Sequence, residues 1–242
     1  MTSKRNVQIA FPTARMFRRT FLFLMPFAVL WTHGTAQAAD LLDRAIAMAG
    51  GEARLANVRN LHWTGTATIF AGNRQIEIGI DTTVRPWLGA RSDTWLRSDG
   101  PAKTRSLIVE GTQGWTEMEG VRKPLPPAQA KNEALQYSLY ALMLLTPLRD
   151  HRAQLVSDDA KGEIAVTHPD APPTVLLFDK EAHLIGARNI VPAPDAGAAP
   201  IHQDIRFSGD MTSKGVHWPK RIEIDQDGKP FFTVRLDSFE AR

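Results

Sequence analysis

The strongest constraint on the fold of this chain is a period of two in hydrophobicity that recurs in many short segments after Leu61. Ile76, Ile78 and Ile80 alternate with polar or small residues, as the side chains of a half-buried β-strand do. The Gly-Asn dipeptide at 72–73 has the chemistry of a tight hairpin turn. We therefore predict that residues 61–70 and 75–84 pair as antiparallel strands.

Similar segments follow, most of them separated by short turns that contain glycine. Further strands are predicted at 90–97, 104–110, 114–118, 153–157, 162–168, 174–178, 183–191, 201–208, 216–225 and 231–239. Many short strands at this spacing indicate one large antiparallel sheet. A twisted sheet of about ten strands must curve. The sequence therefore predicts a mainly β protein with helices (α+β), in which the sheet curls into a barrel or part-barrel.

Two helical segments accompany the strands. A short helix is predicted from Asp40, which can cap its first turn, to the Gly50-Gly51 pair, and a further turn covers 52–57. A longer helix begins at Pro126-Pro127 and runs to about Leu145, because Pro147 prevents its continuation. Its first half is polar and its second half is apolar nearly all round. Either this helix is a core element that plugs the curled sheet, or it is a movable lid over a ligand cavity.

The first 38 residues read as a cleavable export signal. Arg18 and Arg19 precede an apolar run over 21–31, and Ala36-Gln37-Ala38 is a small-residue cleavage site. The apolar run is shorter than the roughly 20 residues that a spanning helix requires. We therefore expect a signal peptide at 1–38 and a single domain at 39–242 that is periplasmic and does not span the membrane. The pair Arg18-Arg19 is compatible with export by the general pathway and by the twin-arginine pathway.

Removal of the leader reverses the sign of the net charge. Five basic residues leave with it, so 24 of the 29 basic residues remain against 26 acidic ones and the net charge changes from +3 to −2. A slightly acidic domain gives no electrostatic support for nucleic-acid binding. The sequence has no cysteine, which excludes disulfides and a lipidated N-terminal cysteine.

No motif of catalysis, cofactor binding or metal binding stands out. The sequence lacks a G-x-S-x-G elbow and an H-E-x-x-H helix, and its Gly50-Gly51 pair follows a helix instead of a strand. His202 and Asp204 are the one close pair of potential metal ligands, and such a pair is common by chance. We therefore expect no enzymatic activity, no cofactor and no metal.

Several motifs occur in an order that resembles the periplasmic lipoprotein carriers of the LolA type and their relative LolB. An export signal and a helix that ends in Gly-Gly are followed by a hairpin, by Val84-Arg85-Pro86-Trp87-Leu88 at a strand junction, and by Glu110-Gly111-Thr112-Gln113-Gly114-Trp115. The segments 215–220 and 228–230 look more like the broader group of outer-membrane lipoprotein-sorting-like proteins. The resemblance covers nearly the whole mature chain.

The resemblance implies an unclosed antiparallel β-barrel with a helical lid or plug over a hydrophobic cavity that shelters acyl chains. Arg85 would match the family arginine that locks the lid to the sheet. We expect the cavity and lid to be lined by aromatic and aliphatic residues, namely Trp63, Trp87, Trp95, Trp115, Tyr137, Tyr140 and Leu144.

The function implied is a non-enzymatic carrier or sensor, whose partners are a lipid or an acylated protein and a protein of the inner or outer membrane. The alternative is an envelope interaction module with a filled core. A third interpretation is a hydrolase whose site is assembled across strands.

Overall fold

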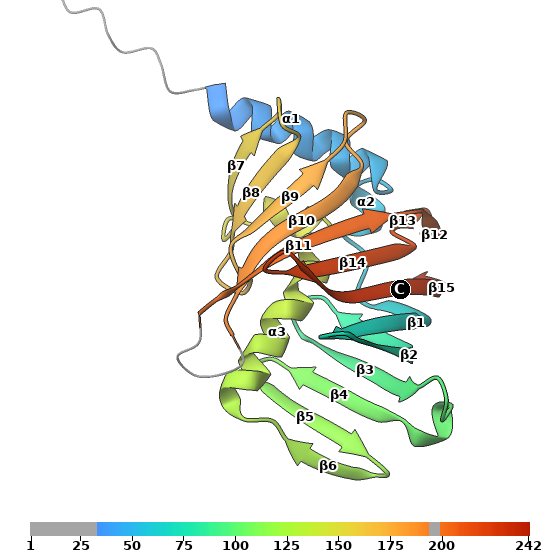
Figure 1. The fold of residues 1–242 in the computed structure, drawn as a ribbon. Helices are drawn as coiled ribbons and strands as arrows, with labels where there is room; N and C mark the ends of the chain where they lie inside the picture. Colours follow the sequence, from blue (N-terminus) through green and yellow to red (C-terminus); the bar gives the residue numbers. More distant parts are fainter. Residues whose placement is uncertain (1–32, 194–198) are drawn as a thin grey trace, which may run out of the picture. The chain divides into compact units, whose positions relative to one another are not determined.

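A single antiparallel sheet of 13 strands dominates the computed structural model, which describes residues 33–193 and 199–242 (Figure 1). The strands lie in the order β6-β5-β4-β3-β2-β1-β15-β14-β11-β10-β9-β8-β7. Their bounds are β1 (Leu61–Ala71), β2 (Arg74–Arg85), β3 (Gly89–Leu96), β4 (Arg105–Glu110), β5 (Gln113–Met118), β6 (Val121–Pro124), β7 (Gln154–Asp158), β8 (Glu163–Thr167), β9 (Thr174–Phe178), β10 (Leu184–Val191), β11 (Ile201–Ser208), β14 (Arg221–Gln226) and β15 (Lys229–Ala241).

Three helices and a separate hairpin complete the described part of the chain. They are α1 (His33–Met48), α2 (Glu52–Leu55), α3 (Pro127–Leu142) and the hairpin of β12 (Met211–Ser213) with β13 (Val216–Trp218). Short 3₁₀ turns cover Pro101–Lys103 and Thr146–Arg149. No helix in the described ranges is long and apolar enough to cross a bilayer.

The predicted first hairpin is confirmed. β1 and β2 pair antiparallel from Leu61 opposite Val84 to Ala71 opposite Arg74, around the Gly-Asn turn. The C-terminal strand β15 pairs with the other edge of β1 and also with β14, so it joins β1–β6 to the strands that follow α3. The result is the predicted curled, unclosed antiparallel barrel.

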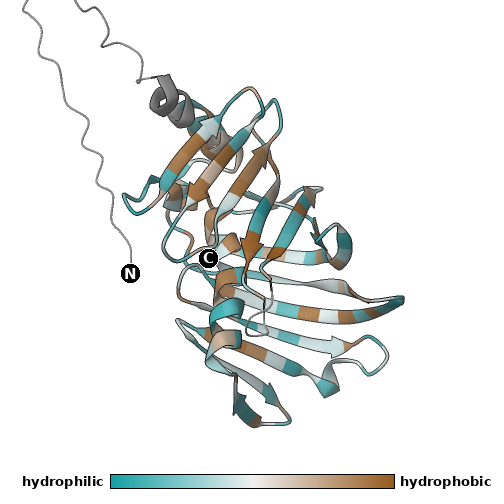
Figure 2. Cartoon of the chain, turned by 60° about the vertical axis from the view of Figure 1, so that its left-hand side comes forward, coloured by the Kyte–Doolittle hydropathy of each residue, from teal (hydrophilic) through white to brown (hydrophobic). Residues whose placement is uncertain are grey.

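The two faces of the sheet differ sharply in burial. We call the face that carries Trp63, Ile80 and Val84 the inner face, because these residues belong to the buried core. Figure 2 shows the cause in the sequence, since hydrophobic residues alternate with hydrophilic ones along the strands. α3 packs against β3, β4, β5 and β10, and α1 packs against β7, so both helices help to cover the core (Figure 1).

Several elements differ from those predicted. α1 begins at His33, so Asp40 lies inside the helix and does not cap it. α3 ends at Leu142, before the predicted end near Leu145, because Leu145 adopts a left-handed φ of 61°. The predicted strand 216–225 is broken at Pro219, since proline cannot donate to a strand ladder, and β13 and β14 lie on either side of it. The short strands β6 and β12 were not predicted.

The predicted leader lies mostly outside the described residues. Residues 1–32 hold its basic pair and apolar run, and 33–38 form the first part of α1. The signal peptide, the cleavage site and the domain limits therefore remain predictions.

Candidate functional site

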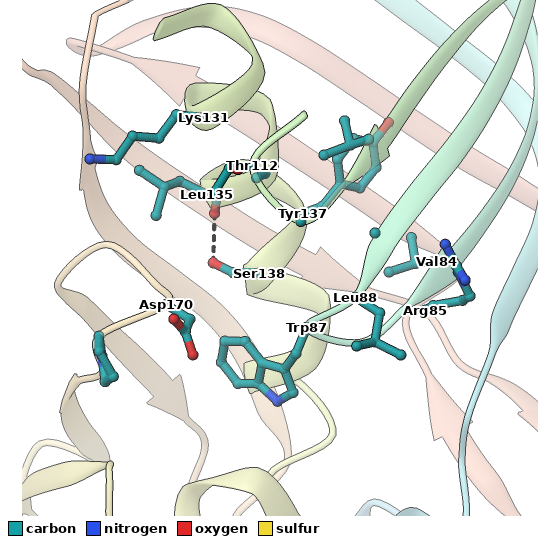
Figure 3. A pocket seen from close by; sticks show the side chains of 15 residues that line it. Val84, Arg85, Trp87, Leu88, Thr112, Lys131, Leu135, Tyr137, Ser138 and Asp170 are labelled. Atoms are coloured by element: carbon teal, nitrogen blue, oxygen red, sulfur yellow. Dashed lines mark hydrogen bonds between the residues drawn. The ribbon is translucent and has the colours of Figure 1, made fainter. Parts of the chain in front are cut away.

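A cavity of about 270 Å³ lies between α3, two turns of the sheet and the loop after β8. We call it the α3 pocket (Figure 3). It is lined by the β2–β3 turn, the β4–β5 turn, the middle of α3 and two loop residues, namely Val84, Arg85, Trp87, Leu88, Gly89, Val109, Gly111, Thr112, Lys131, Ala134, Leu135, Tyr137, Ser138, Pro169 and Asp170. Most of these side chains are apolar, and the two cationic ones, Arg85 and Lys131, lie at opposite ends in Figure 3.

The β2–β3 turn places Trp87 and Leu88 at this pocket. The backbone N–H of Leu88 donates to the carbonyl of Arg85 (2.9 Å), with Pro86 and Trp87 at the two central positions. Trp87 has a φ of 65°, which a type II turn requires at its second central residue and which normally favours glycine. A large aromatic residue is therefore held in a strained conformation at the edge of the pocket.

Trp87 stacks on His168, which follows β8. Their ring centroids are 4.4 Å apart and the planes are 22° from parallel. The backbone N–H of Asp170 donates to Nδ1 of His168 (3.1 Å), so the ring nitrogen Nε2 carries the proton of the neutral imidazole. Burial lowers the pKa of His168, and the nearby positive charge of Arg152 lowers it further. The structure thus favours a neutral histidine beneath Trp87.

Arg85 lies at the pocket but does not make the predicted contact with a helix. Its Nη2 donates to Oε1 of Glu110 (3.4 Å), and among the described residues it forms no hydrogen bond with a carbonyl of α3. Two acids close to Arg85 in the sequence, Asp81 and Asp93, pair with His62 and Arg91 and not with Arg85. Arg85 therefore ties the β2–β3 turn to the end of β4, and the lid-locking contact expected from the resemblance is absent from this conformation.

The two tyrosines of α3 occupy different surroundings. Tyr137 lines the α3 pocket, while Tyr140 packs against Trp63 with ring centroids 4.9 Å apart. Burial raises the pKa of Tyr137, and burial raises the pKa of Tyr140 to about 12. The surroundings of both side chains therefore disfavour the ionised tyrosinate.

Three of the predicted lining residues belong to the packed interior. Trp63 and Leu144 are buried in the core, and Tyr140 packs against it. The C-terminal turn of α3 and the residues after it are buried too, since Leu139 and all residues from Ala141 to Leu145 are almost inaccessible. The core interpretation of the helix therefore holds from Leu139 onward, and the cavity borders the stretch from Lys131 to Ser138.

Trp95 and Trp115 lie on the outer face, contrary to the prediction that they line the cavity. Trp95 is opposite Gly79 on β2, and a Cβ at Gly79 would lie 2.3 Å from its indole ring. The neighbours Ile78 and Ile80 point to the opposite, inner face. Trp115 stands between Ile108 and Pro124, with the guanidinium of Arg122 5.6 Å from its ring centroid.

Of the 15 residues that line the pocket, the sequence predicted three as site residues, Arg85, Trp87 and Tyr137. Leu88 and Pro169 come from loops that no periodic pattern marks, and Leu135 lies in the apolar half of the predicted helix. The Arg-Pro-Trp-Leu segment itself was the usable signal, since an exposed leucine beside a tryptophan in a turn is unusual.

One group of potential metal ligands is present among the described residues. Side-chain atoms of Asp179, Glu181 and His183 lie within 4.8 Å of one another in the exposed β9–β10 turn. His202 and Asp204 do not belong to it. Nδ1 of His183 already pairs with Asp179 (3.0 Å), and nothing else in the turn indicates an ion.

Comparison with known proteins gives a fold and no close relative. No protein-family model and no curated protein matches the sequence. Solved structures do match. A DUF1329 family protein from Desulfovibrio piger superposes with a TM-score of 0.55 at 10% identity, over 84% of this chain and 92% of that one. A LolA superfamily protein from Nitrosomonas europaea superposes with a TM-score of 0.55 at 11% identity, over 85% of this chain and 93% of that one.

A third structure agrees with these two. A putative outer membrane lipoprotein-sorting protein domain from Vibrio parahaemolyticus gives a TM-score of 0.51 at 9% identity, over 86% of this chain and 93% of that one. The identities are low, but the matched regions span most of both chains in every case. Together with the unclosed sheet crossed by α3, they show that this chain has the LolA-like fold.

Proposed function

We propose that the protein is a non-enzymatic periplasmic carrier or sensor that binds an acyl-chain lipid, or the acyl groups of a lipoprotein, at the α3 pocket. The observation that carries this proposal is the apolar α3 pocket itself, which opens beside the turn that holds Trp87 and Leu88. Leu88 is 63% exposed, so a bound alkyl chain would remove its apolar surface from water. The fold supports the proposal because one of its matches is named as a lipoprotein-sorting domain.

Two parts of α3 suggest how a longer chain is accommodated. The C-terminal turn from Leu139 is fixed by the core, whereas the preceding stretch has Lys131, Leu135 and Tyr137 at the cavity. A cavity of about 270 Å³ is slightly smaller than the roughly 300 Å³ at which ligand pockets usually begin. The part of α3 before Leu139 is therefore the part that moves to admit a lipid, and Tyr137 is the side chain that the ligand displaces.

A titration with a dansyl-labelled fatty acid tests this proposal. Leu88→Gln removes apolar surface at the pocket without touching the core, and should weaken probe binding about fivefold, which corresponds to about 1 kcal/mol. Val156→Gln is the matched control, because Val156 is 72% exposed on the edge strand β7 and lines no pocket described here. Equal affinities of both variants and of the unmodified protein would refute the proposed site.

An interaction module with a filled core remains the second candidate. The dense packing of Leu142 and Leu145 favours it, because both side chains are almost inaccessible and belong to the core. The same titration with labelled fatty acid distinguishes the two functions. A module without a ligand site would show no saturable binding of the labelled fatty acid.

A further inference from the structure

A second cavity of about 470 Å³ lies where the C-terminal end of α1 meets the sheet. We call it the α1 pocket. Its walls come from α1, the end of α3, the start of β10, the end of β11 and β13, namely Ala45, Met48, Ala49, Met143, His183, Leu184, Ile185, Phe207, Ser208, Gly209, Asp210, His217, Trp218 and Pro219. Its volume lies within the range of small-molecule sites, and it shares no lining residue with the α3 pocket.

The floor of the α1 pocket is apolar and adaptable. Phe207, Trp218 and Met143 are buried there, while Met48 is 39% exposed at its edge. Methionine side chains are flexible and polarizable, so two of them can fit around an alkyl chain of variable shape. This composition suits a linear hydrocarbon.

The rim of the α1 pocket carries negative charge. Asp210 lines it, and its carboxylate contacts Nδ1 of His217 at 3.1 Å and 3.2 Å. His183, on the same rim, pairs through Nδ1 with the carboxylate of Asp179. No lysine or arginine is among the lining residues. α1 also ends here at Met48, and the C-terminus of a helix carries a partial negative charge.

An apolar floor beneath a negative rim selects one class of ligand. We propose that the α1 pocket binds a single-chain amphiphile with a positively charged amine head group. The alkyl chain lies on Phe207, Trp218 and the two methionines, and the ammonium lies at Asp210. A fatty acid fits the same floor but places its carboxylate against Asp210, which repels it.

Calorimetric titration of the mature protein with decylammonium, decanol and decanoate tests this assignment, because the three probes share one chain length and differ in head-group charge. The α3 pocket takes acyl chains too, so binding at the α1 pocket is measured as the part that Met48→Gln weakens. In that part, decylammonium should bind most tightly and decanoate most weakly. Asp210→Asn should weaken decylammonium about threefold to fivefold, the range expected of a partly exposed ion pair, and leave decanol unchanged. Met48→Gln should weaken decylammonium and decanol alike.

Two controls separate this site from other causes. Asp237→Asn changes the net charge equally at an acid of similar exposure (56%, against 61% for Asp210) that lines neither pocket, and should leave all three affinities unchanged. Leu88→Gln, at the α3 pocket, should also leave the preference for decylammonium intact. The assignment is overturned if decanoate or decanol binds as tightly as decylammonium in the Met48-dependent part of the binding, or if Asp210→Asn and Asp237→Asn behave alike.

Discussion

Trp87 and His168 stack face to face although they belong to opposite parts of the sheet. Trp87 follows β2 and His168 follows β8, and six strands separate β2 from β8 in the sheet order. The contact therefore joins two distant parts of the curled sheet beside the α3 pocket, which Trp87 lines together with Pro169 and Asp170. A ligand in this pocket would lie next to one member of the stacked pair, Trp87.

The strained backbone at Trp87 gives a first prediction. Both Trp87→Ala and Trp87→Gly remove the stack on His168, but only glycine relieves the left-handed φ of 65°. Trp87→Gly should therefore be more stable than Trp87→Ala by about 1 kcal/mol, because an L-residue in this region costs about that much. Urea denaturation of both variants measures the difference, and an alanine variant at least as stable as the glycine variant would contradict the turn geometry.

The lowered pKa of His168 predicts a loss of stability in acid. The usual pKa of histidine is 6.5, and burial lowers the pKa of His168. The positive charge of Arg152 lowers this pKa further, while the negative charges of Asp170 and Asp150 oppose the shift. As pH falls below about 6.5, this histidine binds a proton in the unfolded chain but stays neutral in the folded protein. Stability therefore falls until the pH reaches the pKa of His168 in the folded protein. His168→Gln should lose less stability than the unmodified protein between pH 7.5 and pH 5. Parallel losses in both proteins would show that His168 titrates normally.

The two tyrosines of the sequence both lie on α3, so tyrosine absorbance reports this helix alone. Burial raises the pKa of Tyr140 to about 12 and raises the pKa of Tyr137 as well. Ultraviolet titration should therefore show little tyrosinate in the folded protein at pH 10.5, and about the normal amount in denaturant. Above pH 10 the unfolded chain releases protons that the folded one retains, so stability falls there too. Ionisation of one tyrosine near pH 10 in the folded state would mean that it is exposed.

The pairing of Arg85 with Glu110 predicts a small structural effect. Both side chains are about half exposed, and exposed ion pairs contribute about 0–1 kcal/mol. Arg85→Leu and Glu110→Gln should therefore change stability by similar small amounts in thermal unfolding. A loss of several kcal/mol in Arg85→Leu alone would show that Arg85 has a further partner, such as the helix carbonyls that the resemblance implied.

The strands could be predicted from the sequence because each is a local pattern. Residues 61–85 alternate cleanly around a Gly-Asn turn, and the observed register follows from that turn. The sheet order could not be predicted, because it depends on the pairing of β1 with β15, more than 150 residues apart. The residues that resemble the lipoprotein carriers, Arg85 to Leu88, did lead to the α3 pocket.

The face of the sheet on which a tryptophan lies could not be predicted either, for a related reason. A shift of one residue in register moves every side chain of a strand to the other face. The β2–β3 connection is Pro86-Trp87-Leu88, which fixes no register by its sequence, so Trp95 could equally have faced the interior. Its place opposite Gly79 depends on the three-dimensional pairing.

Lipid binding at the α3 pocket is the central claim, and the most direct test is mass spectrometry of organic extracts from protein purified out of the periplasm. The mature protein and its Val156→Gln variant should carry an acyl-chain lipid in a reproducible ratio to protein, and Leu88→Gln should carry less. Repeated preparations of the mature protein without any co-purifying lipid, or equal lipid on Leu88→Gln, would contradict the account.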